Sequence, residues 1–486
     1  MWPFTRKPKA NQAPILFTNT LSGTKEIFAP LRAGVVSMYS CGPTVYAKQH
    51  IGNLRPYIFA DTIARILADA GYHVRRVINI TDVGHLVSNA DEGEDKMLVG
   101  AKRENLRPEE IAERYTGIFL EDLTLLNILT TDILFPKATE YVNEQIEMIK
   151  ALEAKGHTYR TKDGLYFDTS TFPAYGRLGG GDVAQTREYA LADLGRRIKE
   201  NKEKKHAADF ALWKFAPFGV ERLQEWPSPW GTGFPGWHIE CSAMSKALLG
   251  ETIDIHTGGM DHIPVHHNNE IAQSESVSER PLARFWMHEA FITMNGEKIS
   301  KSLGNDIYLS QITEHGLHPL SLRYLYLGAH YRTPVDFTWE SIEAANEALL
   351  RLWRHTATLK KEAKGIAQDS EASRRLIAVV REDLSTAAAL ALLWEAINDD
   401  ELTPKEAWGV VEAAERVLGL MLTNPPEDVL PKTLEELPSH VQELEKQRQA
   451  ARKRKDYASA DALRINIEDS GYRVEDGPSG TMFIKK

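Results

Sequence analysis

Two cysteines and a histidine–glutamate pair form the most chemically specific combination in this sequence. The chain has 486 residues but only 2 cysteines, Cys41 and Cys241. His266 and Glu270 belong to the segment HHNNE, where a helical spacing of i and i+4 would turn both side chains to one face. Two thiolates, an imidazole and a carboxylate suit zinc, which accepts mixed ligands. The sequence therefore predicts a zinc site made of Cys41, Cys241, His266 and Glu270, with His267 as the main rival to His266.

The tetrapeptide HIGN, His50 to Asn53, has the residue types that contact a nucleotide. Gly52 allows the backbone to lie close to the ligand, while His50 and Asn53 can bond its phosphates. The free N–H groups at the start of a helix also attract phosphate. The tetrapeptide is not the glycine-rich GxGxxG pattern, so it predicts a nucleotide without naming one.

Two later segments have residues that suit the other parts of a nucleotide. Gly258 and Gly259 follow an alternating apolar stretch and precede Asp261, which can accept hydrogen bonds from ribose hydroxyls. The segment EKISKSLGN carries Lys298 and Lys301, whose ammonium groups can neutralise the charge that develops on a leaving pyrophosphate. Taken singly, Gly-Gly turns and Lys-Ser loops are common, so the prediction depends on their combination with HIGN.

A βαβ unit is expected to position the first of these segments. The apolar run Val35 to Tyr39 predicts a buried strand, and Pro56 to Ala70 has the apolar spacing of a helix. A second strand is predicted from His73 to Ile80. In a unit of this kind a nucleotide binds where the loop meets the helix. The loop Cys41 to Arg55 is therefore expected at the ligand-binding edge of a parallel sheet.

Composition narrows the class of protein. Hydrophobic residues make up 42% and charged residues 26%, as in ordinary globular proteins, and no apolar run approaches the roughly 20 residues of a membrane span. The net charge of -10 disfavours a general nucleic-acid binder, so any nucleic acid must meet local basic patches. The two cysteines do not form a disulfide framework, and the basic N-terminus lacks the apolar core of a secretory signal. We expect a cytoplasmic protein with no membrane contact.

Changes in pattern along the chain predict six segments. They are an N-terminal tail (1–26), the first half of a Rossmann-type domain (27–118), an inserted connective subdomain (119–206), the second half with the zinc site and KISKS loop (207–305), a helical bundle (306–424), and a small C-terminal unit (425–486). The second half of the sheet is expected to begin near Asp209, and Thr139 is expected to cap a helix. One charged helix followed by a hairpin is expected at the C-terminus.

Together these motifs resemble the class I aminoacyl-tRNA synthetases, and within them the cysteinyl-tRNA synthetase family. The signature sequences of the class, usually HIGH and KMSKS, stand here as HIGN and KISKS. Asn53 replaces the second signature histidine but still donates to phosphate. Further matching stretches are CGPTVY, NITDV, DFALWK, GWHIECSAM, GGMDHIPVHHNNEIAQSE, WMHEAFITMNGEKISKSLGN, HYRTP, ARKRKDYASADALR and DGPSGT.

The resemblance implies an α/β fold: a Rossmann-type parallel-sheet catalytic domain split by an insertion, followed by an α-helical bundle and a small C-terminal α+β anticodon-binding unit. It implies one zinc ion per chain, on which the substrate thiolate binds directly. Thr81 and Trp237 match residues of the amino-acid pocket, and Asp476 matches an anticodon contact. ATP enters with Mg²⁺, and the residues assigned to it are His50, Gly52, Asn53, Gly258, Gly259, Asp261, Lys298 and Lys301.

The implied reaction is activation of L-cysteine by ATP and transfer to tRNA(Cys). His50, Asn53, Lys298 and Lys301 are the expected catalytic residues. The basic cluster of the C-terminal unit, including Arg452 and Arg454, is expected to contact tRNA, although solvated helix charges would look the same. The protein is expected to be a monomer. Two alternatives remain: a related ligase that passes cysteine to an amino sugar, and a non-catalytic paralogue that binds tRNA or zinc.

Overall fold

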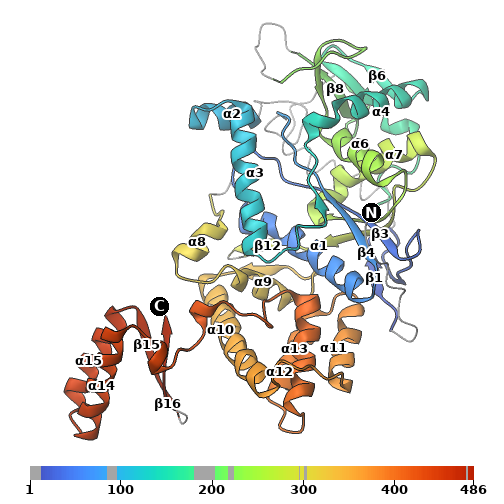
Figure 1. The fold of residues 1–486 in the computed structure, drawn as a ribbon. Helices are drawn as coiled ribbons and strands as arrows, with labels where there is room; N and C mark the ends of the chain where they lie inside the picture. The colour runs from blue at the N-terminus through green and yellow to red at the C-terminus, as the bar shows by residue number, and fades with distance from the viewer. Residues whose placement is uncertain are drawn as a thin grey trace. The chain divides into compact units, whose positions relative to one another are not determined.

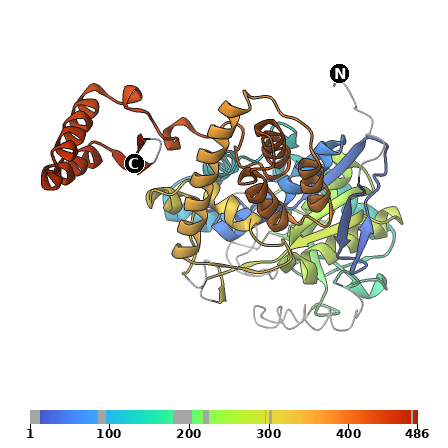
Figure 2. The same ribbon diagram turned by 90° about the horizontal axis from the view of Figure 1, so that it is seen from below.

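The computed structural model describes residues 13–84, 96–179, 203–216, 224–294, 296–299, 304–477 and 480–485. Contacts divide the chain into two units, Met1–Glu343 with Ala378–Ala388, and Ala344–Ile377 with Ala389–Lys486. Figures 1 and 2 show the ribbon from two directions. None of the described helices combines the length and the hydropathy that crossing a bilayer would need.

A parallel five-stranded sheet is the centre of the first unit (Figure 1). Its order is β11-β10-β3-β4-β5, and every neighbouring pair is parallel. The strands are β3 (Val35–Ser40), β4 (His73–Ile78), β5 (Ile133–Leu134), β10 (Ile253–Gly259) and β11 (Ala283–Glu289). Strands distant in sequence, β3 and β10, are hydrogen-bonded neighbours. The expected Rossmann-type sheet is therefore confirmed.

Helix α1 (Ile51–Asp69) links β3 to β4 and is buried along nearly its whole length. It begins five residues before the expected start at Pro56, because Ile51 and Leu54 are fully buried and His50 caps the first turn. Pro56 lies inside the helix and cannot donate to the carbonyl of Gly52. The HIGN tetrapeptide therefore lies at the helix N-terminus itself.

The other helices of the first unit pack around this sheet and its insertion. They are α2 (Lys96–Glu104), α3 (Pro108–Leu125), α4 (Val142–Ala154), α6 (Trp237–Leu249), α7 (Asn268–Ser278), α8 (Leu309–Glu314) and α9 (Leu320–Leu327). The expected cap at Thr139 is wrong, since α4 begins at Val142. Thr139 instead donates from its backbone N and its hydroxyl to the Asp82 carboxylate, at 3.0 and 2.6 Å.

An antiparallel sheet of four strands, order β6-β7-β8-β9, forms the insertion. The strands are β6 (Thr158–Arg160), β7 (Gly164–Phe167), β8 (Phe210–Phe215) and β9 (Gly233–Pro235). The expectation that the parallel sheet resumes near Asp209 is wrong, because β8 pairs with the insertion's β7 and β9. The parallel sheet resumes only at β10. A short buried apolar strand fits either kind of sheet, so its partner could not be read from its residues.

The expected N-terminal tail over residues 1–26 is wrong for its second part. Strands β1 (Leu16–Asn19) and β2 (Thr24–Ile27) form an antiparallel hairpin. Phe17 is fully buried, and the backbone N–H of Thr20 donates to the carbonyl of Trp286 at 2.7 Å. The hairpin is thus part of the first unit. Three further strands, β12 (Ile292–Met294), β13 (Glu297–Lys298) and β14 (Val335–Phe337), form a small mixed sheet beyond β11.

A fully buried carboxylate, Asp61, connects α1 to its neighbours. Arg65 and Arg323 donate to its Oδ2 at 2.6 and 2.7 Å, and Arg76 lies 3.3 Å from Oδ1. The same arginines donate to the backbone carbonyls of residues 126, 127 and 129. The three guanidinium groups hold the pKa of Asp61 well below its usual range, although burial opposes them.

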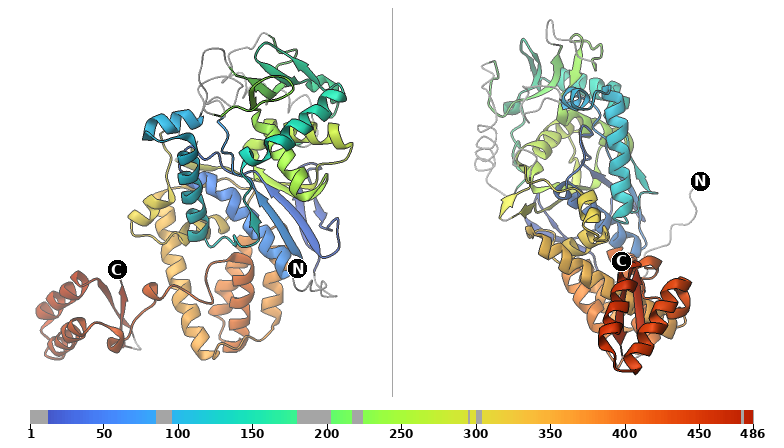
Figure 3. Two further views of the ribbon diagram at one scale, coloured as in Figure 1. Left: turned by 45° about the horizontal axis from the view of Figure 1, so that its top comes forward. Right: turned by 90° about the vertical axis from the view of Figure 1, so that its left-hand side faces the viewer.

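The second unit contains a helical bundle and a small α+β part, each visible in Figure 3. The bundle helices are α10 (Trp339–Glu362), α11 (Glu371–Arg381), α12 (Thr386–Ile397) and α13 (Pro404–Leu418), some of which extend into the first unit. The terminal part contains α14 (Ser439–Lys453), α15 (Tyr457–Asp469), β15 (Tyr472–Gly477) and β16 (Gly480–Lys485). The expected single charged helix is therefore wrong. Lys455 has a φ of 59°, and the Asp456 side chain caps α15 by accepting from Ser459 N.

Candidate active site

Cys41, Cys241, His266 and Glu270 meet in the core of the first unit. One ligand atom from each lies within 4.8 Å of the others, and all four residues are buried. Glu270 Oε1 is 3.4 Å from Cys41 Sγ and 3.1 Å from His266 Nε2. The structure thus brings the sequence-predicted ligand set together, with Cys41 and Glu270 229 residues apart in the chain.

Local chain geometry explains how the four side chains converge. Cys41 follows β3 directly, at the carboxyl edge of the sheet. Cys241 lies on α6, whose cap Gly236 has no space for a side chain, because a Cβ there would be 2.0 Å from the Ala211 carbonyl oxygen. His266 lies in a short π-helical segment, Ile263–His267, that runs into α7 and puts Glu270 one turn later.

The charges of the cluster favour a cation. Burial alone would lower the pKa of His266, but hydrogen bonds to Cys241 and Glu270 raise it to about 10. Burial raises the pKa of Cys41, and its contacts with Cys241 and Glu270 add to the effect. The pKa of Cys241 is lowered by its hydrogen bond with Cys41, and that of Glu270 is lowered by His256 and His266 although burial opposes them, so both side chains favour their anionic forms. The donor set and the electrostatics therefore both fit a zinc ion.

Other histidines surround the cluster and hold its members in place. His238 Nδ1 lies 2.8 Å from His266 Nδ1, and His256 Nε2 lies 2.9 Å from Glu270 Oε2. Such outer partners orient metal ligands. The rival His267 is also close, with its Nε2 3.4 Å from Cys41 Sγ. A second possible set, Cys41, His256, His267 and Glu270, meets the same distance limit but lacks the second thiol.

Thr81 and Trp237 lie beside the cluster. The Trp237 ring centroid is 4.8 Å from that of His266. Thr81 donates to Glu240 Oε2 at 3.0 Å and accepts from Asn79 at 3.1 Å. Asn79 and Glu240 were missed from the sequence, although Glu240 is fully buried directly before Cys241. A carboxylate directly before a candidate metal ligand is the sequence signal that would have identified Glu240.

The HIGN tetrapeptide forms the N-terminal turn of α1. His50 Nδ1 accepts from Asn53 N at 3.3 Å, and the Asn53 amide donates to Gln49 at 3.0 Å. A Cβ at Gly52 would lie 3.0 Å from the His50 ring and 4.0 Å from Ile299 Cβ. The first contact explains why glycine is needed. The second shows that the KISKS segment begins beside HIGN.

The two glycines at the end of β10 lie at the same sheet edge, and other side chains pack directly against them. A Cβ at Gly258 would lie 2.6 Å from His267 Cε1, and one at Gly259 would lie 2.4 Å from Asp261 Oδ1. Neither position tolerates a side chain without rearrangement. Of the expected lysines, Lys298 has its backbone in β13. Its side chain and all of Lys301 lie outside the described residues.

In the C-terminal part, two of the expected tRNA contacts, Asp476 and Arg452, lie together. Its carboxylate forms ion pairs with the buried Arg448 and with Arg452, both at 2.7 Å. Arg448 also pairs with the fully buried Glu445 at 2.7 Å. Asp476 is thus a partner of two arginines, one of which is structural. Arg454 caps the end of α14, where the two helices turn.

Two known protein families match different parts of the chain. Residues 27–347 match the tRNA synthetases class I (C) catalytic domain, and residues 434–483 match the cysteinyl-tRNA ligase anticodon binding domain. A cysteine–tRNA ligase 1 from Burkholderia lata is 46% identical, with 96% of each chain covered. A cysteine–tRNA ligase from Thermus thermophilus is 40% identical, covering 96% of this chain and 98% of its own.

Solved structures extend the likeness in fold. A methionyl-tRNA synthetase from Mycobacterium tuberculosis with methionyl-adenylate is 15% identical, with a TM-score of 0.52 over 81% of this chain and 92% of its own. A leucyl-tRNA synthetase from Agrobacterium radiobacter, in a ternary complex, is 12% identical, with a TM-score of 0.54 over 82% and 86%. The family match over the catalytic part and the nearly full-length relatives decide the assignment. The chain belongs to the cysteinyl-tRNA ligase family of class I aminoacyl-tRNA synthetases.

Proposed function

We propose that the protein activates L-cysteine with ATP and transfers the cysteinyl group to tRNA(Cys). In the first step a carboxylate oxygen of cysteine attacks the α-phosphorus of ATP, and pyrophosphate leaves. In the second step a hydroxyl of the terminal tRNA ribose attacks the carbonyl carbon, and AMP leaves. The observation that carries the proposal is the convergence of two thiols, an imidazole and a carboxylate in the unit that also contains the HIGN turn.

Cys41, Cys241, His266 and Glu270 would hold one zinc ion. When bound, zinc selects a thiolate over a neutral hydroxyl and lowers the thiol pKa, which shape alone could not achieve between cysteine and serine. Trp237 and Thr81 are proposed to line the pocket for the substrate's amino acid. The histidines around the cluster orient its ligands and exclude water.

ATP, entering with Mg²⁺, is proposed to lie along the carboxyl edge of the sheet. His50, Gly52 and Asn53 face its phosphates at the start of α1, and Gly258, Gly259 and Asp261 receive the adenosine. Lys298 and Lys301 stabilise the departing pyrophosphate. We further propose a cytoplasmic monomer whose domains follow the segments predicted above, corrected for the hairpin of β1 and β2 and for β8, which belongs to the insertion. Within them, residues 425–486 are the anticodon-reading unit.

The direct test is ATP–pyrophosphate exchange with cysteine and serine side by side, followed by charging of bulk tRNA. Pyrophosphate exchange that depends on cysteine but not on serine, followed by formation of cysteinyl-tRNA, would support the proposal. Exchange without charging would favour the second candidate, a ligase that passes cysteine to an amino sugar. The match of residues 434–483 to an anticodon-binding domain argues against that candidate. Absence of exchange would favour a non-catalytic paralogue.

Replacing Lys301 with alanine is expected to slow exchange by roughly 10²–10³-fold, the typical cost of one transition-state donor. Cysteine binding should change little, because the ammonium group acts on charge that exists only in the transition state. Lys150→Ala is a matched control, since Lys150 is on the surface of α4 and pairs only with Glu147 among the described residues. An exchange rate unaffected by Lys301→Ala would reject the role.

Replacing Asp476 with asparagine is expected to lower kcat/KM for tRNA by about 5- to 150-fold, as for the loss of one base contact. Exchange should stay near the wild-type rate, because the catalytic step does not involve this unit. Glu475→Gln is the matched control, since Glu475 precedes it in β15 and pairs with Arg473 and Arg354. A thermal melt shows whether loss of the Arg448 ion pair has unfolded the unit. Full charging by a folded Asp476→Asn protein would contradict the anticodon role.

A further inference from the structure

Glu289 is a buried carboxyl at the nucleotide edge that the mechanism above does not use. It is the last residue of β11, and its Cα partner in the neighbouring strand β10 is Gly259. Its side chain is 3% exposed. Because carboxyl ends of parallel strands meet at one edge, Glu289 lies on the same edge as Gly258, Gly259 and HIGN.

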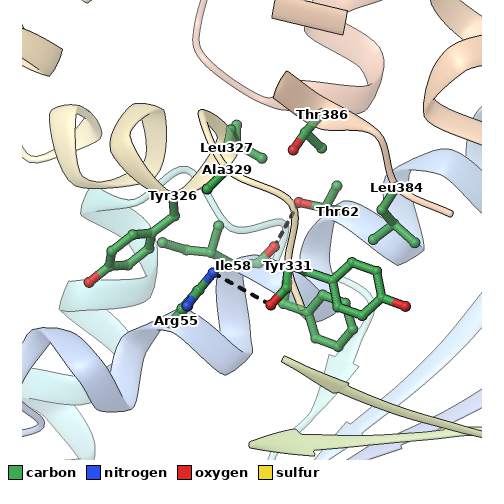
Figure 4. Close-up of a pocket in the computed structure, with 10 residues that line it drawn as sticks. Arg55, Ile58, Thr62, Tyr326, Leu327, Ala329, Tyr331, Leu384 and Thr386 are labelled. Carbon is green, nitrogen blue, oxygen red and sulfur yellow. Dashed lines mark hydrogen bonds between the residues drawn. The ribbon is translucent and has the colours of Figure 1, made fainter. Parts of the chain in front are cut away.

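Part of this carboxyl lacks a partner. In the described part of the chain, Glu289 Oε2 accepts no hydrogen bond, and no ion pair joins the residue to a cation. Arg55 lies near but is occupied, donating to the carbonyls of Ala290 at 2.7 Å and Thr333 at 2.9 Å. Figure 4 shows Arg55 directed at the Tyr331 carbonyl, to which it donates at 3.5 Å. A buried polar group left unpaired is costly, which points to a ligand that pairs with it.

The second carboxyl at this edge, Asp261, lies close to Glu289 beside Gly259. The position of a Cβ on Gly259 is 3.4 Å from Glu289 Oε1 and 2.4 Å from Asp261 Oδ1. The two carboxyl groups therefore lie next to each other on one side of Gly259, where the residue has no side chain of its own. Two neighbouring carboxyl groups repel phosphate, and they accept hydrogen bonds from a pair of adjacent hydroxyls.

Electrostatics agree with this geometry. Burial raises the pKa of Glu289 well above its usual range, and Asp261 adds to the effect while Arg55 opposes it. A carboxyl that holds its proton can both donate to and accept from a hydroxyl. A neutral sugar hydroxyl is thus a better partner for it than an anion.

We propose that Glu289 is a second ribose-binding residue, which bonds the ribose hydroxyl of ATP that Asp261 does not. The inference rests on the proposed function, in which ATP lies along this edge. It makes nucleotide choice depend on both ribose hydroxyls. Glu289 is thereby a specificity-determining residue of the activation step.

The test compares ATP, 2′-deoxy-ATP and 3′-deoxy-ATP as substrates in cysteine-dependent pyrophosphate exchange. Glu289→Met keeps the volume of the side chain but cannot bond a hydroxyl. Its kcat/KM for ATP is expected to fall about 10- to 100-fold, the usual range for a bond to a charged or buried group. For one of the two deoxynucleotides, kcat/KM should change less than about threefold, because that hydroxyl is already absent. Asp261→Asn should remove the preference for the other hydroxyl.

The readouts separate a ribose contact from a structural role. The KM for cysteine and the melting temperature of Glu289→Met should match the wild type, since an unpaired carboxyl is replaced by an apolar group. The inference is overturned if kcat/KM falls by the same factor for ATP and both deoxynucleotides. It is also overturned if the variant keeps the wild type's preference for each ribose hydroxyl. If Glu289→Met does not fold, Glu289→Ala decides, because alanine cannot bond a hydroxyl, and an unchanged ATP to deoxynucleotide ratio in that variant rejects the contact. Failure of the wild type to catalyse exchange would instead reject the proposed function.

Discussion

Protein carrying Cys241→Ser is expected to lose its zinc and, with it, the activation of cysteine. A hydroxyl is a poor ligand compared with a thiolate, and the remaining set has only one soft donor. Removing an outer partner of a metal ligand already costs about 10- to 100-fold in affinity, so removing a ligand should cost more. The measurement is zinc content per chain by elemental analysis of protein purified without chelator, together with exchange driven by cysteine.

Ser245→Ala is the matched control for this substitution. Ser245 lies on the same helix α6, one turn after Cys241, and is fully buried with no hydrogen-bond partner for its hydroxyl among the described residues. Its loss should leave both zinc content and exchange unchanged. A full complement of zinc in Cys241→Ser, or no zinc in the wild type, would show that this cluster is not the metal site.

Replacing Asp61 with asparagine is expected to destabilise the protein by about 3–5 kcal/mol, the usual cost of leaving buried charge uncompensated. Arg65, Arg76 and Arg323 would then share a buried site without a carboxylate. The same guanidinium groups donate hydrogen bonds to the backbone carbonyls of the segment 126–129, so we expect that segment to be destabilised as well. Denaturant unfolding of the wild type and the variant measures the difference.

The contribution of Asp61 also has a definite dependence on pH. Its pKa is lower in the folded protein than its ordinary value of 3.8, so the carboxylate stabilises the fold above that pH. As pH falls below about 4, the unfolded chain takes up the proton first, and the stability difference between wild type and Asp61→Asn should shrink. Asp132→Asn, at an exposed position, should change stability by less than about 0.5 kcal/mol. Equal effects of the two substitutions would contradict the central role of Asp61.

The chemical character of the protein could be predicted from the sequence alone. The proposed zinc site follows from the types of residue available, two thiols, an imidazole and a carboxylate, and from the local spacing of His266 and Glu270. The HIGN and KISKS segments likewise carry their chemistry in adjacent residues. Local helices and strands followed from periodicity, because the side chains of one short segment decide which face is buried. The family resemblance drew on the same local motifs.

Pairings between distant segments could not be predicted in this way. Whether β8 joins the parallel sheet or the insertion depends on which edge is free, and its own residues suit both. The hairpin of β1 and β2 gains its stability from contacts with residues near Trp286, which a reading of the N-terminus alone does not include. The break between α14 and α15 depends on one residue, Lys455, in a left-handed conformation.

Several site residues depend on tertiary structure for the same reason. Glu240 and Glu289 look like ordinary acidic residues in the sequence, and only the packing of α6 and β11 shows that both are buried. Asp476 also looks like an ordinary acidic residue in the sequence, and only the folded hairpin shows that it pairs with Arg448 and Arg452. The sequence by itself determined which chemical groups are present and which local elements carry them. Tertiary structure decided which groups meet, because burial and pairing are properties of contacts between segments far apart in the chain.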